Sequence, residues 1–220
     1  MKNEALEKAV EIRISDVVLE GDLFIPEDAK GIVLFAHGSG SSRHSPRNRY
    51  VAGVLQKEGM ATLLIDLLTK KEDSVYETRF NIDLLVSRLL EITEWLKEQE
   101  ETKELSVGYF GASTGAAAAL KAAARSKVGI FAVVSRGGRP DLAESALDKV
   151  DAPTLLIVGG DDSVVIELNQ MAYRKLNAPK ELVIVPGATH LFEEPGTLEE
   201  VARLATRWFN KHVHSTTEEI

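Results

Sequence analysis

The serine at position 113 has the surroundings of a catalytic nucleophile. It is the central residue of the G-x-S-x-G pentapeptide at residues 111–115, which follows an apolar run (105–110) and precedes an alanine-rich stretch (116–124). A sharp strand-to-helix turn of this kind holds the hydroxyl out of the sheet, within reach of a base. The helix that follows aims amide N–H groups and its positive end at the same place. Such pentapeptides also arise by chance, so a base and an acid are needed to give the motif meaning.

A carboxylate and an imidazole follow two later apolar runs. The run 153–158 leads into Asp161 and Asp162, and the run 182–185 leads into His190. Ligand sites in open α/β sheets form just beyond the carboxyl ends of the strands. The chain order serine, aspartate, histidine is also that of a hydrolase triad. On these grounds either aspartate can supply the acid.

Each of the three residues also has a purely structural interpretation. Ser113 can cap the helix that follows it, which is a common role of serine. Asp162 can cap a helix that starts near Val164, and His190 can be a loop histidine bonded to backbone. All three together, in hydrolase order, favour the triad.

The composition is that of an ordinary globular protein. The chain has 220 residues, 44% hydrophobic and 27% charged, which suffices for one sizeable core, so we expect one domain over 1–220 with a polar tail from about residue 215. It has no cysteine, which excludes disulfides, thiolate metal sites and a cysteine nucleophile. The net charge of −8 argues against nucleic-acid binding. Without a signal-peptide pattern or a run of membrane-spanning length, we expect a cytoplasmic protein with no membrane partner.

The remaining pattern predicts the elements that position these residues. Strands are expected at 10–14, 17–25, 32–36, 61–66, 105–110, 129–134, 153–158 and 181–185. Helices are expected from the loop after the third strand to about 57, and at 79–99, 115–125, 141–147, 164–176 and 198–212. Thr197 and Glu200 have the spacing of a capping box at the last helix. The alternation predicts a largely parallel sheet with helices on both faces and an antiparallel N-terminal edge.

Four motifs carry a resemblance to a known family. They are His37-Gly38-Ser39-Gly40, the pentapeptide at 111–115, Gly159-Gly160-Asp161-Asp162-Ser163-Val164 and Gly187-Ala188-Thr189-His190. With them the chain resembles the α/β-hydrolase fold over nearly its whole length, most closely the small branch of dienelactone-hydrolase-like proteins without a large cap. The short interval 134–153 also leaves room for one small helix only. The loop 38–49 and the segment 134–140 are further similar to hydrolase domains fused to phosphoribosyltransferase-like domains.

The resemblance implies a role for each matching residue. Ser113 would be the nucleophile, Asp162 rather than Asp161 the acid and His190 the base. The backbone N–H groups of Ser39 and Thr114 would form the oxyanion hole, and His37 would shape its loop. No cofactor or metal is implied. Dienelactone hydrolases use a cysteine nucleophile, so the serine favours an esterase acting on small carboxylic esters, with lactones, dienelactones and thioesters as alternatives.

Several arginines follow strands whose ends should border the site. Arg43, Arg47 and Arg49 come after one central strand, and Arg136 and Arg139 after another. Guanidinium groups there would bind an anionic substrate through paired N–H donors, which makes Arg43, Arg136 and Arg139 candidate substrate-binding residues. The alternative is that they form surface ion pairs with the chain's own carboxylates.

Two other classes of protein compete with a hydrolase. The glycines and serines at 38–42, followed later by Asp66, imitate a dinucleotide-binding fingerprint, but Arg43 stands where the third glycine belongs. A non-catalytic module on a hydrolase fold would lack a triad member, and none is missing here. Neither alternative explains the order of Ser113, Asp162 and His190.

Overall fold

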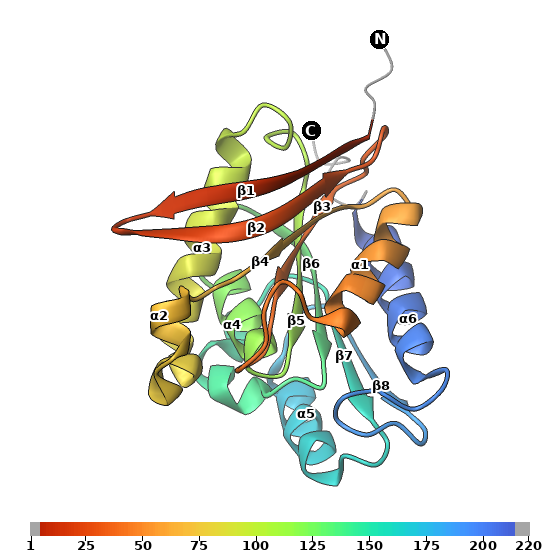
Figure 1. Ribbon diagram of the computed structural model, residues 1–220. Helices are drawn as coiled ribbons and strands as arrows, with labels where there is room; N and C mark the ends of the chain where they lie inside the picture. The colour runs from red at the N-terminus through yellow and green to blue at the C-terminus, as the bar shows by residue number, and fades with distance from the viewer. Residues whose placement is uncertain (1–4, 214–220) are drawn as a thin grey trace.

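The computed structural model describes residues 5–213, and one eight-stranded sheet organises them in the order β1-β2-β4-β3-β5-β6-β7-β8 (Figure 1). The strands are β1 (Leu6–Ile14), β2 (Val17–Ile25), β3 (Ile32–Ala36), β4 (Ala61–Ile65), β5 (Val107–Ala112), β6 (Ile130–Arg136), β7 (Thr154–Gly159) and β8 (Lys180–Val185). Strands β3 to β8 pair in parallel, whereas β2 pairs antiparallel with both β1 and β4. The predicted parallel sheet with an antiparallel N-terminal edge is confirmed. The tail predicted from residue 215 lies outside the described residues.

The central strands are covered on both faces. Every residue of β3, β4, β5 and β7 is buried, which requires helices on each side of the sheet. One face packs against α1 (Pro46–Lys57) and α6 (Thr197–His212). The other packs against α3 (Ile82–Glu98), α4 (Thr114–Ala123), the 3₁₀ segment η2 (Pro140–Lys149) and α5 (Ser163–Lys175).

The structure differs from the prediction around two helix starts. The 3₁₀ segment η1 (Tyr76–Phe80) takes up the first residues of the helix predicted at 79–99, and α3 starts only after Asn81. The short helix α2 (Lys70–Asp73) precedes η1 and was not predicted. The predicted capping box of Thr197 and Glu200 is wrong. Gly196, with φ +83°, occupies the N-cap position of α6, and the Thr197 hydroxyl donates to the carbonyl of Glu194 at 2.7 Å. The two residues have the right spacing but start one position too late.

No cap domain covers the carboxyl ends of the parallel strands within residues 5–213. Only η2 lies between β6 and β7, as the short interval predicted. These strand ends face the bottom of Figure 1, where the loops that carry the predicted site residues also lie. Within the same residues, no helix combines the length and the apolarity that crossing a bilayer requires.

Candidate active site

Ser113 lies in a strained turn between β5 and α4. Its backbone has φ 51° and ψ −120°, a conformation that costs a non-glycine residue about 1–3 kcal/mol. The motif glycines make room for this turn. A Cβ on Gly111 would lie 2.4 Å from the Cα of Ala116, and one on Gly115 would lie 2.2 Å from the carbonyl oxygen of Ala36. Ser113 occupies the N-cap position of α4 but its side chain makes no capping hydrogen bond, so the cap does not explain this serine.

Main-chain hydrogen bonds fix the turn to the end of β6. The amide of Ser113 donates to the carbonyl of Arg136 at 3.2 Å. The carbonyl of Ser113 accepts from the amides of Ala116 and Arg139, each at 3.1 Å. The strained backbone is therefore held on both sides, by its own helix and by the neighbouring strand.

Asp162 and His190 form a hydrogen-bonded pair. The carboxylate Oδ2 of Asp162 lies 2.7 Å from Nδ1 of His190. An ionised carboxylate can only accept, so Nδ1 carries the proton and Nε2 keeps a free lone pair. Asp162 stands at the N-cap position of α5 without a side-chain capping bond, so its carboxylate serves the histidine instead. Of the two aspartates that the pattern left open, Asp162 is the partner.

The pair forms because the loop after β7 docks onto the loop after β8. A Cβ on Gly159 would lie 2.4 Å from the carbonyl oxygen of Ala188, so only glycine fits there. The amide of Gly160 donates to Val185 at 2.8 Å, and that of Asp161 donates to Ala188 at 3.0 Å. These contacts bring the aspartate beside the histidine loop.

The imidazole also rests on the loop after β6. Gly137 has φ +52°, and a Cβ there would lie 3.5 Å from both Nδ1 and Cε1 of His190. On the other side, Glu194 accepts from the Thr189 amide at 3.1 Å and from its hydroxyl at 2.6 Å. The loop after β6 thus lies against the ring, and Glu194 fixes the backbone beside the histidine.

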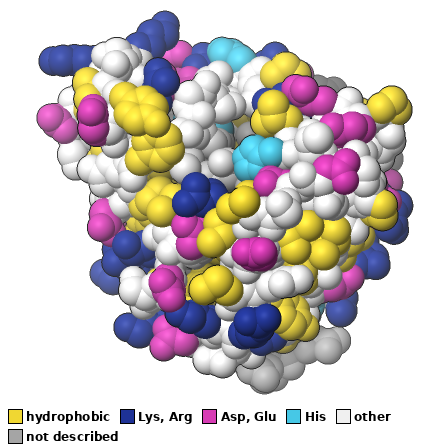
Figure 2. Space-filling model, turned by 90° about the horizontal axis from the view of Figure 1, so that it is seen from below, with side chains coloured by type: hydrophobic (Ala, Val, Ile, Leu, Met, Phe, Trp, Pro, Cys, Tyr) yellow, Lys and Arg dark blue, Asp and Glu magenta, His cyan; other side chains and the backbone are white. Residues whose placement is uncertain are grey.

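Ser113 and His190 line one small pocket at the carboxyl ends of the strands. Its volume is about 80 Å³, and it opens to solvent. Its lining is Gly38, Ser39, Ser41, Ser45, Arg47, Asn48, Ala112, Ser113, Arg136, His190 and Leu191. Figure 2 looks onto this end of the sheet and shows histidine side chains, in cyan, beside a hollowed and largely uncharged area.

The two predicted oxyanion donors lie beside Ser113. Thr114 is the first residue of α4, where an amide has no acceptor within the helix. The loop after β3 packs closely, since a Cβ on Gly38 would lie 3.2 Å from Cβ of Ser113. The amide of Ser39 donates to the Thr114 hydroxyl at 2.9 Å. To bind an oxyanion, this amide would have to exchange that partner or share its proton.

His37 braces the loop after β3, as the resemblance implied. The Leu67 amide donates to Nε2 of His37 at 3.1 Å, so the proton is on Nδ1, which donates to the Gly38 carbonyl at 2.9 Å. Burial lowers the pKa of this imidazole, although Gly38 and the nearby Asp66 and Asp73 act in the opposite direction. His37 is therefore a neutral support between two loops.

Arg43 and Arg139 are neutralised by the chain's own carboxylates, and neither lines the pocket. Arg43 forms ion pairs with Asp66 and with Glu20, the latter at 2.8 Å. Arg139 binds both oxygens of Asp141, at 2.9 and 2.7 Å. For these two residues the surface-ion-pair interpretation fits the structure.

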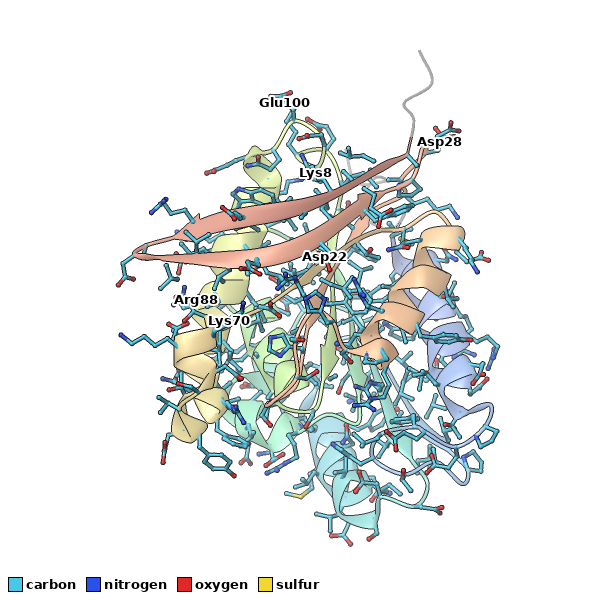
Figure 3. The ribbon with its side chains drawn as sticks, viewed as in Figure 1. Lys8, Asp22, Asp28, Lys70, Arg88 and Glu100 are labelled. Carbon is cyan, nitrogen blue, oxygen red and sulfur yellow. The ribbon has the colours of Figure 1, made fainter. Side chains whose placement is uncertain are left out.

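Asp22 adds a third carboxylate to the surroundings of Arg43. In Figure 3 it projects from β2 toward the segment between β3 and α1. It lies 3.7 Å from Arg43 and 3.4 Å from Arg49. Arg49 is thereby also tied to the sheet edge.

Arg136 is the one of the three candidate arginines that lines the pocket, and Arg47 joins it there. Arg136 is 6% exposed, and its guanidinium lies 5.8 Å from the centre of the Phe192 ring. Arg47 forms an ion pair with Glu193 at 2.9 Å. The sequence placed Arg47 in the loop region but gave no reason to prefer it over Arg43. Arg47 lies in the first turn of α1, whereas Arg43 lies in the loop before it, and this difference in position could have distinguished the two residues.

The described residues offer no obvious set of metal ligands. Among residues 5–213, no three His, Asp or Glu side chains are grouped so as to hold a metal ion. The chemistry that the pocket can do is that of a hydroxyl, an imidazole–carboxylate pair and guanidinium groups.

The chain has close relatives of known sequence. Two proteins of Mycobacterium tuberculosis, from strains CDC 1551 and H37Rv and provisionally named phosphoribosyl transferases, are each 59% identical over 207 residues. The match covers 94% of this chain and 47% of each relative, so the chain spans about half of their length.

Solved structures show the same fold. A dienelactone hydrolase from Anabaena variabilis is 58% identical, with a TM-score of 0.92 over 96% of this chain and 99% of that one. Est1E from Butyrivibrio proteoclasticus shares the fold at 17% identity, with a TM-score of 0.81 over 93% and 98% of the two chains, and a further structure of Est1E holds ferulic acid. The expected α/β-hydrolase fold without a cap is thereby confirmed. Because residues 19–216 match the family model itself, the chain belongs to the dienelactone hydrolase family.

Proposed function

We propose that the protein is a serine hydrolase that cleaves small carboxylic esters through an acyl-enzyme on Ser113. The observation that carries this proposal is the 2.7 Å contact between Asp162 and Nδ1 of His190, in a pocket shared with the strained serine. That contact leaves Nε2 as the base, which is the role a triad histidine needs. Membership of a family of hydrolases supports the same chemistry.

The proposed reaction runs in two halves. His190 accepts the hydroxyl proton of Ser113 while Oγ attacks the ester carbonyl, and Asp162 stabilises the resulting imidazolium. The backbone N–H groups of Thr114 and Ser39 stabilise the oxyanion, at about 10²–10³ in rate for each donor. His190 then gives its proton to the leaving alcohol. Water, activated by the same histidine, releases the acid from Ser113.

Lactone hydrolysis is the second candidate. The 58% identical structure from Anabaena variabilis carries the name dienelactone hydrolase. The same groups would open a lactone, with the alcohol kept on the acyl chain instead of leaving. The transferase name belongs to relatives about twice as long as this chain, and we attach no transferase activity to it.

A panel of short methyl esters and lactones tests the proposal. Wild type should hydrolyse at least one of them, and Ser113→Ala should lower kcat by about 10⁴ or more. Ser39→Ala is the matched control, because it removes a hydroxyl from the same pocket but keeps the backbone N–H. Equal activity of Ser113→Ala and wild type would exclude Ser113 as the nucleophile.

A further inference from the structure

We infer that Arg136 and Arg47 form an anion-binding subsite beside Ser113, separate from the oxyanion hole. The favoured substrates would then be esters that bear a second, anionic group such as a carboxylate or phosphate. The inference rests on the proposed function in one respect, namely that the bound anion is part of an ester substrate. The subsite itself is argued from the charges and burial of the pocket.

The first observation is a buried charge without a counter-ion. Arg136 and Arg88 are both 6% exposed, but they differ in their partners. Arg88, labelled in Figure 3, forms an ion pair with Glu72 at 2.9 Å. Nε of Arg136 has no acceptor among residues 5–213, and no carboxylate contributes to its ionisation. Since an unpaired buried charge is costly, the position of Arg136 needs an explanation beyond packing.

The second observation is a second cation in the same pocket. Burial and, to a smaller extent, the positive charge of Arg47 together lower the pKa of Arg136 to about 10, so the two guanidinium groups are close enough to repel. The one ion pair of Arg47 within the described residues is with Glu193, whose side chain is 63% exposed. An exposed pair of this kind contributes little. An anion between the two cations would remove the repulsion.

Other contacts do not replace such an anion. The ring of Phe192, 5.8 Å from the Arg136 guanidinium, gives at best a weak cation–π contact. Among the described residues that line the pocket there is no aspartate or glutamate. The pocket also includes Ser45, the N-cap of the twelve-residue helix α1, whose positive end adds to the same potential.

The subsite is coupled in position to the proposed nucleophile. The carbonyl of Arg136 accepts from the Ser113 amide at 3.2 Å, and the two residues line one pocket of about 80 Å³. An anionic group bound by Arg136 would therefore lie in the same pocket as the carbonyl under attack. A guanidinium binds both oxygens of a carboxylate, or two of a phosphate, through parallel N–H donors.

Three esters of equal chain length test this subsite: methyl butyrate, monomethyl succinate and the methyl ester of 3-phosphonopropanoate. They end in a methyl, a carboxylate and a phosphonate, so the preferred ester shows which anionic group the subsite binds. Wild type should have a higher kcat/KM for at least one of the two anionic esters than for methyl butyrate. Arg136→Gln should lower the anionic-to-neutral ratio of kcat/KM about tenfold or more, and Arg136→Lys should restore part of it. Arg139→Gln, at the same end of the sheet but paired with Asp141, should leave the ratio unchanged.

A binding measurement separates this inference from the proposed function. Succinate or inorganic phosphate at millimolar concentration should raise the Tm of wild type and of Arg139→Gln, but not that of Arg136→Gln. A Tm shift without hydrolysis of any ester would leave the subsite standing and overturn the proposed function. Hydrolysis without an anion preference, and without an Arg136-dependent Tm shift, would overturn the subsite and leave the proposed function standing.

Discussion

The backbone amide of Ser113 donates a hydrogen bond to the carbonyl oxygen of Arg136, with 3.2 Å between the two atoms. One residue at the end of β6 thus holds the strained turn through its main chain and places a guanidinium in the pocket through its side chain. Replacing that side chain keeps the main-chain contact. Variants at Arg136 therefore report on the charge rather than on the position of Ser113.

The buried guanidinium should lower the stability of the folded protein. Burial, with a smaller effect of Arg47, lowers its pKa from 12.5 to about 10, a penalty on the charged form of about 3 kcal/mol. The penalty is full below pH 10 and is relieved as pH rises from about 10 toward 12.5. Urea unfolding at pH 7 should therefore find Arg136→Gln at least as stable as wild type.

Arg88→Gln is the matched control for this prediction. Arg88 is as buried as Arg136, but it forms an ion pair with Glu72. The Arg88→Gln variant leaves Glu72 without that ion-pair partner, so it should lower the free energy of unfolding. If Arg136→Gln lost as much stability as Arg88→Gln, the Arg136 charge would have to be compensated in the folded protein.

Acid should weaken the fold through His37. Its folded pKa lies below the unfolded value of 6.5, chiefly because of burial, so the unfolded chain takes up the proton first. Stability from this group is present above pH 6.5 and falls as pH drops from 6.5 toward the folded pKa. Protonation of Nε2 would also oppose the Leu67 amide, which donates to it.

His37→Gln isolates this contribution, because an amide oxygen can accept from Leu67 without titrating. Thermal melts between pH 7.5 and pH 5 should show a shallower fall of Tm in the variant than in wild type. Parallel curves for the two proteins would assign the acid sensitivity to other groups, such as His212, whose pKa is also lowered by burial.

Two glycines should respond oppositely to alanine. At Gly115 a Cβ would lie 2.2 Å from the carbonyl oxygen of Ala36, so Gly115→Ala should destabilise the protein by several kcal/mol, on the order of 4. At Gly53, inside α1, nothing lies within 4 Å of a new Cβ, and alanine should stabilise the helix by about 0.5–1 kcal/mol. Urea unfolding of both variants checks the signs, and equal effects would contradict the packing described for the turn.

The neighbouring aspartates provide a test of the proposed triad. Asp162→Asn should lower kcat by about 10³–10⁴, because an amide can hold the imidazole in the wrong tautomer and cannot stabilise its positive charge. Asp161→Asn should change kcat little, since within the described residues it is Asp162 that contacts His190. Steady-state kinetics on one good ester compares the two. A larger loss in Asp161→Asn would reverse the assignment.

The sequence predicted the sheet and the approach of Asp162 to His190 because both depend on local patterns. The run 153–158 is short, rich in branched apolar residues and followed by glycines, which favours a strand covered on both faces. Parallel strands bring their carboxyl ends together. The choice between Asp161 and Asp162 needed the family motif, because adjacent residues differ only in the direction of their side chains.

The sequence did not predict which arginines would pair with carboxylates of the chain itself. Arg43 is neutralised by Glu20 and Asp66, which come from two other strands, β2 and the end of β4. Nothing near Arg43 in the chain announces those partners. The Thr197 capping box failed for a local reason, since Gly196 with φ +83° takes the N-cap position first.

Covalent labelling with a fluorophosphonate tests the central claim most directly, because the probe reacts with a serine activated by a neighbouring base. Mass spectrometry should find one adduct per chain, on the peptide that contains Ser113, with no adduct in Ser113→Ala and slower labelling in Asp162→Asn. An adduct that persists in Ser113→Ala, or the absence of any adduct on wild type that hydrolyses esters, would contradict the assignment of Ser113 as the nucleophile.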